Sequence, residues 1–305
     1  MASLPKKLVR LLFFGNYFYG ICAAALSVEA ILQQRFPLNR PLYFILAFAA
    51  TVLYYSKAYI TTEVSKDSTN RRSAWYALNR TEILWGQLAF LIITIACGGL
   101  FIFQKWENIL ALNLFEWLLI FVFPVVAVMY YGLSSPAFTI YTLRNIGWLK
   151  PFIIGFIWAG LVTVYPIIFY CIDHGIHYTV TLVGCFLFIK NFMYVTVLCI
   201  MFDIKDYAMD YNQQLKTFVV KAGLRNTIFY IIIPLCILGL AAFISYAVIH
   251  HFHPVKILLN TIPFILTIIV AYSLHNRKDI FYYLVIIDGL MLVKAVCGTI
   301  GMLYF

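Results

Sequence analysis

Charged residues are scarce in this sequence of 305 residues. Asp, Glu, Lys and Arg together make up 11% of the chain, whereas an average soluble domain has about 25%. Hydrophobic residues account for 64% and aromatic residues for 18%. This composition excludes intrinsic disorder and an ordinary soluble enzyme, because a soluble fold cannot bury so much apolar surface. The chain is therefore expected to lie in a lipid bilayer.

Cysteine patterns typical of metal sites and disulfide frameworks are also missing. The chain has 7 cysteines, none of them in a C-x-x-C pair, and most lie inside apolar runs. This spacing argues against a zinc site and against a small disulfide-stabilised secreted domain. We interpret the cysteines as small buried side chains.

Long apolar runs dominate the sequence. A membrane-spanning helix needs about 20 mostly apolar residues, and nine runs approach or exceed that length. They predict an all-α membrane protein, a bundle of about nine transmembrane helices that forms a single domain over residues 1–305. The first run is too long for a signal peptide and is interpreted as an uncleaved span. The runs cover about 9–32, 41–62, 83–103, 112–132, 151–171, 179–202, 226–249, 255–273 and 281–303.

The basic residues indicate how the chain crosses the bilayer. Most of the 22 Lys and Arg residues fall on the side that holds the N-terminus, and two lie within spans. Loops on the cytoplasmic side carry an excess of Lys and Arg, so we predict a multi-pass protein with a cytoplasmic N-terminus. A bacterial inner membrane is the expected location, with an organellar or endoplasmic membrane as the alternative, and no nucleic-acid partner is expected. The basic residues on the opposite side are Arg35, Arg40, Lys105 and Lys256.

Three carboxylates stand at the end of the sixth apolar run. Asp203, Asp206 and Asp210 form a D-x-x-D-x-x-x-D pattern, which places them on one face of a helix. Grouped carboxylates repel one another and favour a bound cation. Hard oxygen ligands suit Mg²⁺, which commonly bridges to substrate phosphates. We therefore predict a Mg²⁺ site here, and a solvated acidic helix end is the alternative.

A second acidic pair follows the second apolar run. Glu63 and Asp67 are four residues apart, again on one helix face. Facing the Asp203 motif across a cavity, this pair would complete a two-sided clamp for Mg²⁺ and a diphosphate. Taken alone, the pair fits an ordinary surface helix equally well.

A diphosphate also needs cationic side chains. Basic residues near the two acidic segments are the candidates, although each also fits a role in membrane orientation. The predicted diphosphate-binding residues are Arg72, Arg144, Lys150 and Lys216.

Taken together, these features resemble the UbiA superfamily of intramembrane prenyltransferases. Asp203, Asp206 and Asp210, followed by Lys216-Thr217 and Gly223, are similar to the second aspartate-rich motif of that family and its continuation. The segment from Tyr141 and Arg144 through Trp148 and Lys150 resembles its tyrosine–basic–tryptophan–glycine segment. Arg10 and Asn16 resemble polar positions of its first span. The resemblance covers nearly the whole chain.

The first aspartate-rich motif departs from the family pattern. Where the family has Asn and its first Asp, this chain has Tyr59 and Ile60, so that only Glu63 and Asp67 remain. This half motif could still hold one Mg²⁺ ion.

The resemblance implies a fold, a reaction and roles for further residues. The fold would be UbiA-like with an active-site cap on the cytoplasmic side. Mg²⁺, held by Glu63, Asp67 and the Asp203 motif, would help an isoprenoid diphosphate to ionise, and Asn16 would join the three aspartates as a catalytic residue. Aromatic rings would stabilise the allylic cation. The candidate rings are Tyr131, Tyr141, Tyr207 and Trp148.

Three functions are compatible with these observations. The first is a prenyltransferase that transfers the prenyl group to an aromatic or other lipophilic acceptor. The second is a UbiA-type terpene cyclase, for which the prenyl diphosphate is the sole substrate. The third is a non-catalytic membrane scaffold or transporter, although no matched pair of broken spans typical of transporters is visible. Prenyl chain length, acceptor and oligomeric state are left open.

Ionisable residues inside the spans are also functional candidates. We expect a structural ion pair between Lys190 of the sixth span and Asp288 of the ninth. Glu29 lies near the outer end of the first span and is expected to need only interfacial water.

Overall fold

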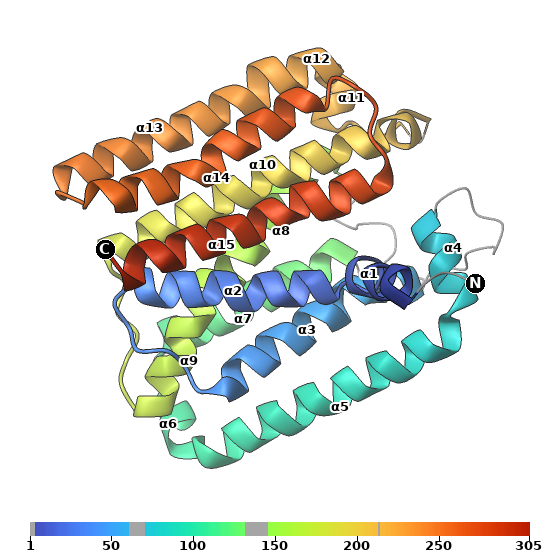
Figure 1. The fold of residues 1–305 in the computed structure, drawn as a ribbon. Coiled ribbons are helices and arrows are strands. Elements are labelled where there is room, and N and C mark those ends of the chain that lie inside the picture. Colours follow the sequence, from blue (N-terminus) through green and yellow to red (C-terminus); the bar gives the residue numbers. More distant parts are fainter. Residues whose placement is uncertain (1–3, 61–70, 132–145, 213) are drawn as a thin grey trace. The chain divides into compact units, whose positions relative to one another are not determined.

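A computed structural model of the chain describes residues 4–60, 71–131, 146–212 and 214–305, which are helical and contain no strand (Figure 1). The predicted all-α class is confirmed for this part of the chain. The helices are α1 (Leu4–Phe14), α2 (Tyr17–Gln33), α3 (Pro41–Ile60), α4 (Arg71–Leu78), α5 (Arg80–Gln104), α6 (Trp106–Leu110), α7 (Leu114–Tyr131), α8 (Lys150–Ala159), α9 (Tyr165–His174), α10 (Leu182–Asn212), α11 (Phe218–Ala222), α12 (Leu224–Asn226), α13 (Ile233–Ile249), α14 (Pro254–Ser273) and α15 (Asp288–Leu303). Three π-helical segments continue or precede them, η3 (Gly160–Val164), η4 (Thr227–Ile232) and η5 (Tyr282–Ile287).

In the described part of the chain, every predicted apolar run coincides with one helix or with consecutive helical segments, but nine spans are not confirmed. By length and composition, 6 helices of the described chain can cross a membrane, and the bent pair α1–α2 is a candidate for a seventh. Helix α7 is apolar but shorter. The six are Arg80–Gln104, Lys150–His174, Leu182–Ala208, Leu224–Ile249, Pro254–Ser273 and Tyr282–Leu303.

Helix α5 shows directly that the protein is embedded in lipid. Its window of high hydropathy is only 6% buried inside the protein, and Trp85 and Phe103 are 68% and 84% exposed. Water does not tolerate an apolar surface of this length on a single helix. The chain is therefore an integral membrane protein.

The chain forms two compact units. Unit 1 comprises Met1–Ala24, Asn39–Leu112 and Phe169–Ile176, and unit 2 comprises Ala25–Leu38, Asn113–Ile168 and His177–Phe305. Helices α2 and α9 each contribute residues to both units.

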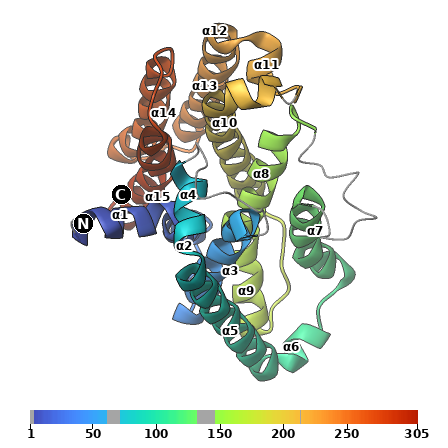
Figure 2. The ribbon, with the colours of Figure 1, turned by 90° about the vertical axis from the view of Figure 1, so that its right-hand side faces the viewer.

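In unit 1, α3 packs along α5, and α4 contacts both helices (Figure 2). Ion pairs and aromatic stacking attach the end of α9 to this unit. Asp173 accepts ion pairs from Arg40 at 2.7 Å and Lys105 at 3.0 Å, and Phe169 stacks on Phe101 with ring centroids 4.0 Å apart. Two of the four basic residues predicted on the outer side therefore have a structural role.

The first predicted span is not one straight helix. Helices α1 and α2 meet at a bend of 62°, where Asn16 has a φ of 66°. A residue in the left-handed region interrupts the helical hydrogen bonding, and Asn is one of the few residues besides Gly that tolerates it. The break places the buried Asn16 side chain at the junction of the two helices.

In unit 2, α8 packs along α10, and α10, α13, α14 and α15 lie side by side (Figure 1). Close approach of α8 and α10 depends on Gly155, where an added Cβ would lie 2.3 Å from Thr196 Oγ1 and 2.9 Å from the Phe192 carbonyl oxygen. Small residues at such contacts let helix backbones approach closely within a membrane.

The predicted Lys190–Asp288 pair is wrong. Lys190 instead pairs with Glu29, with Nζ 3.4 Å from Oε1, and Lys294 pairs with the same carboxylate at 2.6 Å. Glu29 is fully buried, so it does not depend on interfacial water as expected. A buried carboxylate in a bilayer requires a cation, and two lysines from other spans supply it.

Replacing Gly155 by Ala should destabilise unit 2. The added methyl group would meet the Phe192 backbone, which cannot rotate away, and overpacking of this kind costs about 1–3 kcal/mol. Gly289→Ala is the matched control, because nothing lies within 4 Å of a Cβ at that helical position. Thermal unfolding in detergent should show a lower midpoint for Gly155→Ala only. Equal midpoints would contradict the tight α8–α10 contact.

Candidate functional site

The predicted site residues fall into two sets, one in each unit. Lys150, Lys216, Trp148, Tyr207 and the three aspartates belong to unit 2, whereas Asn16 and Arg72 belong to unit 1. Four predicted residues lie outside the described part of the chain, as does the side chain of Tyr131. These four are Glu63, Asp67, Tyr141 and Arg144.

The acidic motif lies on the last turns of α10, as predicted. This helix runs without interruption from the membrane span to Asn212. Asp203 and Asp210 are buried and Asp206 is partly exposed. The motif therefore stands where the helix leaves the membrane-spanning segment, which ends at Ala208.

Lys150 is the direct partner of this motif. It occupies the first position of α8, followed by Pro151, a residue that favours helix starts. Its Nζ lies 2.7 Å from Asp203 Oδ1. A lysine predicted to bind diphosphate is thus placed beside a predicted metal ligand, from a segment 53 residues away in sequence.

Two carboxylate oxygens of the motif have no hydrogen-bond partner among the described residues. They are Asp203 Oδ2 and Asp210 Oδ2, and both are buried. A buried anionic oxygen without a partner is costly. Each of these oxygens can therefore accept a cation or a strong donor that the described residues do not provide.

A Mg²⁺ ion fits this donor set only in part. Within the described chain, no three His, Cys, Asp or Glu side chains are grouped closely enough to hold a metal. Mg²⁺, however, is commonly bound by one or two carboxylates together with substrate phosphates and water. Asp203 and Asp210 can each supply one carboxylate of this kind, but seven residues of helix, about 10 Å, separate them too widely to share one ion. Asp206, which lies between them, pairs with Lys205 at 3.3 Å.

The segment around Gly147, which precedes α8, meets the segment that carries Lys216. A Cβ at Gly147 would lie 2.8 Å from the Lys216 carbonyl carbon and from the Thr217 nitrogen. Thr217 caps α11 by accepting a hydrogen bond from the Val220 N–H at 3.3 Å. The cap fixes the loop, and the Lys216 side chain remains exposed.

The aromatic candidates that the structure describes lie near the protein surface. Trp148 and Tyr207 are 46% and 38% exposed. Sequence reasoning missed Tyr283, which is buried, packs against Phe202 and lies within electrostatic range of Asp206. Its only sequence signal is its place at the start of the ninth apolar run.

In unit 1, Asn16 is the centre of a buried polar cluster. Its Nδ2 donates to Ser56 Oγ at 3.0 Å and to Tyr76 Oη at 2.9 Å, and its Oδ1 accepts from Arg72. Arg72 also donates twice to the Phe14 carbonyl at the end of α1 and lies 4.4 Å above the ring of Tyr59. Sequence reasoning missed Ser56 and Tyr76.

Arg72, which the sequence suggested as a diphosphate-binding residue, has a structural role in this cluster. Its guanidinium is buried and supports the break between α1 and α2. Tyr59, which replaces the usual Asn of the first aspartate-rich motif, stacks on Tyr76 with centroids 4.8 Å apart and lies under Arg72. The replacement therefore has a packing role in this chain.

The geometry of these sites can be compared with known proteins. The sequence matches no protein-family profile and no curated protein sequence. The structure is similar to a solved structure of digeranylgeranylglyceryl phosphate synthase in membranes, with a TM-score of 0.56 and 14% sequence identity. The match covers 98% of this chain and 100% of that one.

The chain has the fold of that synthase. The fold implied by the resemblance to the UbiA superfamily is thereby confirmed, at the level of the fold alone. At this low identity the likeness concerns the fold and leaves the roles of individual residues open.

Loss of the Lys150 ammonium should destabilise unit 2. Lys150→Met would leave Asp203 buried without its cation, and breaking a buried pair costs up to about 3 kcal/mol for a lysine that is partly exposed. The double variant Lys150→Met/Asp203→Asn should recover most of the loss, because no uncompensated charge remains. Thermal unfolding of the wild-type protein, Lys150→Met, Asp203→Asn and the double variant measures this coupling. Purely additive effects would contradict a direct ion pair.

The pH dependence of stability should reveal Asp210. Burial, followed by the nearby Asp203 and Asp206, raises the pKa of Asp210 to about 6, although Lys150 partly opposes this shift. A carboxyl pKa raised on folding favours the protonated native state, so its stabilising effect is complete below the ordinary pKa and disappears as the pH rises through about 6.

In EDTA, the melting midpoint of the wild-type protein should therefore fall between pH 4 and 7 relative to that of Asp210→Asn. Parallel curves for the two proteins would show that the pKa of Asp210 is not raised.

Proposed function

We propose that the chain is a Mg²⁺-dependent intramembrane prenyltransferase that ionises an isoprenoid diphosphate and transfers its prenyl group to an aromatic or other lipophilic acceptor. The observation that carries this proposal is the pair of buried carboxylate oxygens without partners at the end of α10, beside Lys150. The fold similarity to a membrane prenyltransferase is consistent with it.

In this proposal Mg²⁺ would be held by carboxylates of the motif formed by Asp203, Asp206 and Asp210, with Asp206 released from Lys205, and oxygens of the substrate diphosphate would supply further ligands. Bound Mg²⁺ would supply Lewis-acid stabilisation of the negative charge on the leaving diphosphate. Glu63 and Asp67 are proposed as the second carboxylate group that faces the diphosphate.

Lys150 has two roles in this scheme. Without substrate, its ammonium neutralises Asp203, from which it is 2.7 Å away. With substrate bound, a cation would take over Asp203, and Lys150 would be free to donate to the diphosphate. Lys216 and Arg144 are proposed to assist it, because charge on the departing group is best stabilised by cations already in place.

Aromatic rings near the motif would then face the allylic cation. Trp148, Tyr207, Tyr131 and Tyr141 are the candidates taken from the sequence, and Tyr283 is added by its burial near Asp206. A cation above such a ring gains about 0.5–2 kcal/mol. Asn16 is proposed to contribute by stabilising the break between α1 and α2.

The membrane orientation proposed here follows from charge. The N-terminus and the Asp203 end of α10 would face the cytoplasm of a bacterial inner membrane. The substrate tail would remain in the bilayer.

Turnover should depend on the unpartnered carboxylates. With prenyl diphosphates of several lengths, Mg²⁺ and a panel of phenolic acceptors, Asp203→Asn and Asp210→Asn should each lose about 100-fold or more of pyrophosphate release, because each removes preorganised charge at the leaving group. Pyrophosphate release and mass spectrometry of the extracted lipids measure the reaction.

Asp279→Asn is the matched control, since Asp279 is an exposed aspartate outside the proposed machinery, and it should keep wild-type turnover. Full activity of Asp203→Asn would overturn the proposed metal role. A cyclic hydrocarbon or terpene alcohol formed without any acceptor would replace the transferase assignment by a terpene cyclase.

A further inference from the structure

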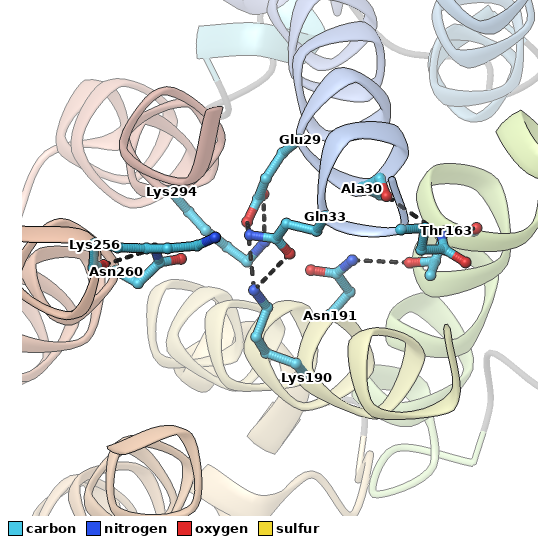
Figure 3. A network of polar contacts seen from close by, with 10 residues as sticks. Glu29, Ala30, Gln33, Thr163, Lys190, Asn191, Lys256, Asn260 and Lys294 are labelled. Carbon is cyan, nitrogen blue, oxygen red and sulfur yellow. Dashed lines mark hydrogen bonds and ion pairs between the residues drawn. The ribbon is translucent and has the colours of Figure 1, made fainter. Parts of the chain in front are cut away.

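A second charged cluster lies in unit 2, near the opposite end of α10 from the aspartates. Lys190 precedes Asp203 by 13 residues, or about 20 Å along a helix. Figure 3 shows Lys190 of α10 and Lys294 of α15 converging on Glu29 of α2. Gln33 joins them, because its Oε1 accepts from Lys190 at 3.0 Å and its Nε2 donates to Glu29 at 3.0 Å.

The positive charge in this cluster is not balanced. Lys190 and Lys294 have side chains only 9% and 6% exposed, and they share the single carboxylate of Glu29. No other described carboxylate lies within ion-pair distance of either lysine. Uncompensated charge within membrane spans is costly and marks functional sites.

The ammonium groups also retain donors without acceptors. An ammonium has three N–H groups. In the described chain Lys190 uses two, toward Glu29 and Gln33, and Lys294 uses one, toward Glu29. The remaining N–H groups can bind oxygens of an anion.

Further basic residues border the cluster. Lys256 and Asn260 of α14 lie against the same helix as Lys294, because a Cβ at Gly301 would be 3.5 Å from Lys256 Cγ and 3.2 Å from Asn260 Nδ2. Arg35 lies within electrostatic range of Lys256. We call Lys190, Lys256 and Lys294 the lysine cluster.

An apolar groove extends from the cluster between α10, α13 and α14. Its walls include Phe186, Met193, Cys236 and Phe264, and its polar lining residues are Lys190 and Tyr194. The ring of Tyr194 also lies 5.8 Å from Lys294 Nζ. The groove is thus continuous with Lys190, and the ring of Tyr194 separates it from Lys294.

We propose that the lysine cluster binds the phosphate of an anionic membrane lipid, whose acyl chain lies in the groove between α10, α13 and α14. A phosphate supplies both the missing negative charge and the acceptors for the remaining N–H groups. An acyl chain matches the apolar walls, and the neighbouring bilayer contains both parts in one molecule. This site is independent of the proposed prenyl transfer.

The test compares lipids that differ only in charge. Purified protein in detergent is titrated with phosphatidylglycerol or phosphatidylcholine of identical acyl chains, and native mass spectrometry measures the bound fraction. We expect phosphatidylglycerol to bind about tenfold more tightly, because lysines near the membrane surface attract anionic lipid headgroups. Lys190→Met and Lys256→Met should reduce this preference.

Lys278→Met, which removes a lysine from the connection between α14 and α15, is the matched control and should keep the wild-type preference. Lys294→Met would remove a partner of the buried Glu29 and could unfold the protein, so the test does not depend on this variant. Lys190→Met and Lys256→Met leave the Glu29–Lys294 pair in place and keep the test valid.

Equal binding of the two lipids by the wild-type protein, or an unchanged preference in both Lys190→Met and Lys256→Met, would overturn the proposal. A further experiment with inorganic phosphate distinguishes a lipid phosphate from free phosphate as the ligand. If millimolar phosphate without lipid raises the melting midpoint as much as phosphatidylglycerol does, and Lys190→Met abolishes both effects, the ligand is free phosphate and the lipid assignment is wrong.

Discussion

A charged side chain inside a bilayer must find its counter-charge within the protein or in a ligand, and this constraint organises unit 2. Helix α10 has buried charged residues near both of its ends. Near its start, Lys190 meets Glu29, and near its end, Asp203 meets Lys150. Both pairs join segments that are distant in sequence, so the same contacts that neutralise charge also connect α10 to α2 and α8.

The two ends of α10 differ in the sign of the charge that remains unbalanced. At the Asp203 end, three aspartates are accompanied by two lysines in ion-pair contact, Lys150 and Lys205, and two buried oxygens stay unpartnered. At the other end, two lysines share one glutamate. One helix thereby presents a site suited to a cation and, about 20 Å away, a site suited to an anion. Both proposals follow from this asymmetry.

Local patterns in the sequence predicted local structure well. The apolar runs predicted the helices, and the spacing of Asp203, Asp206 and Asp210 predicted one continuous helix at the membrane boundary. Partners between helices were harder to predict. Lys190 was assigned to Asp288 because both lie inside spans, yet composition does not tell which helices are neighbours. The break at Asn16 was missed for a similar reason, since its support comes from Arg72, Ser56 and Tyr76 in later segments.

The central claim is that the aspartates at the end of α10 bind a divalent cation together with a diphosphate. Electron paramagnetic resonance with Mn²⁺ and inorganic diphosphate tests it without requiring turnover or an acceptor. The account predicts that the wild-type protein binds Mn²⁺ with phosphorus hyperfine coupling, and that Asp203→Asn/Asp210→Asn weakens the binding about tenfold or more. Unchanged Mn²⁺ binding in the double variant would contradict the account.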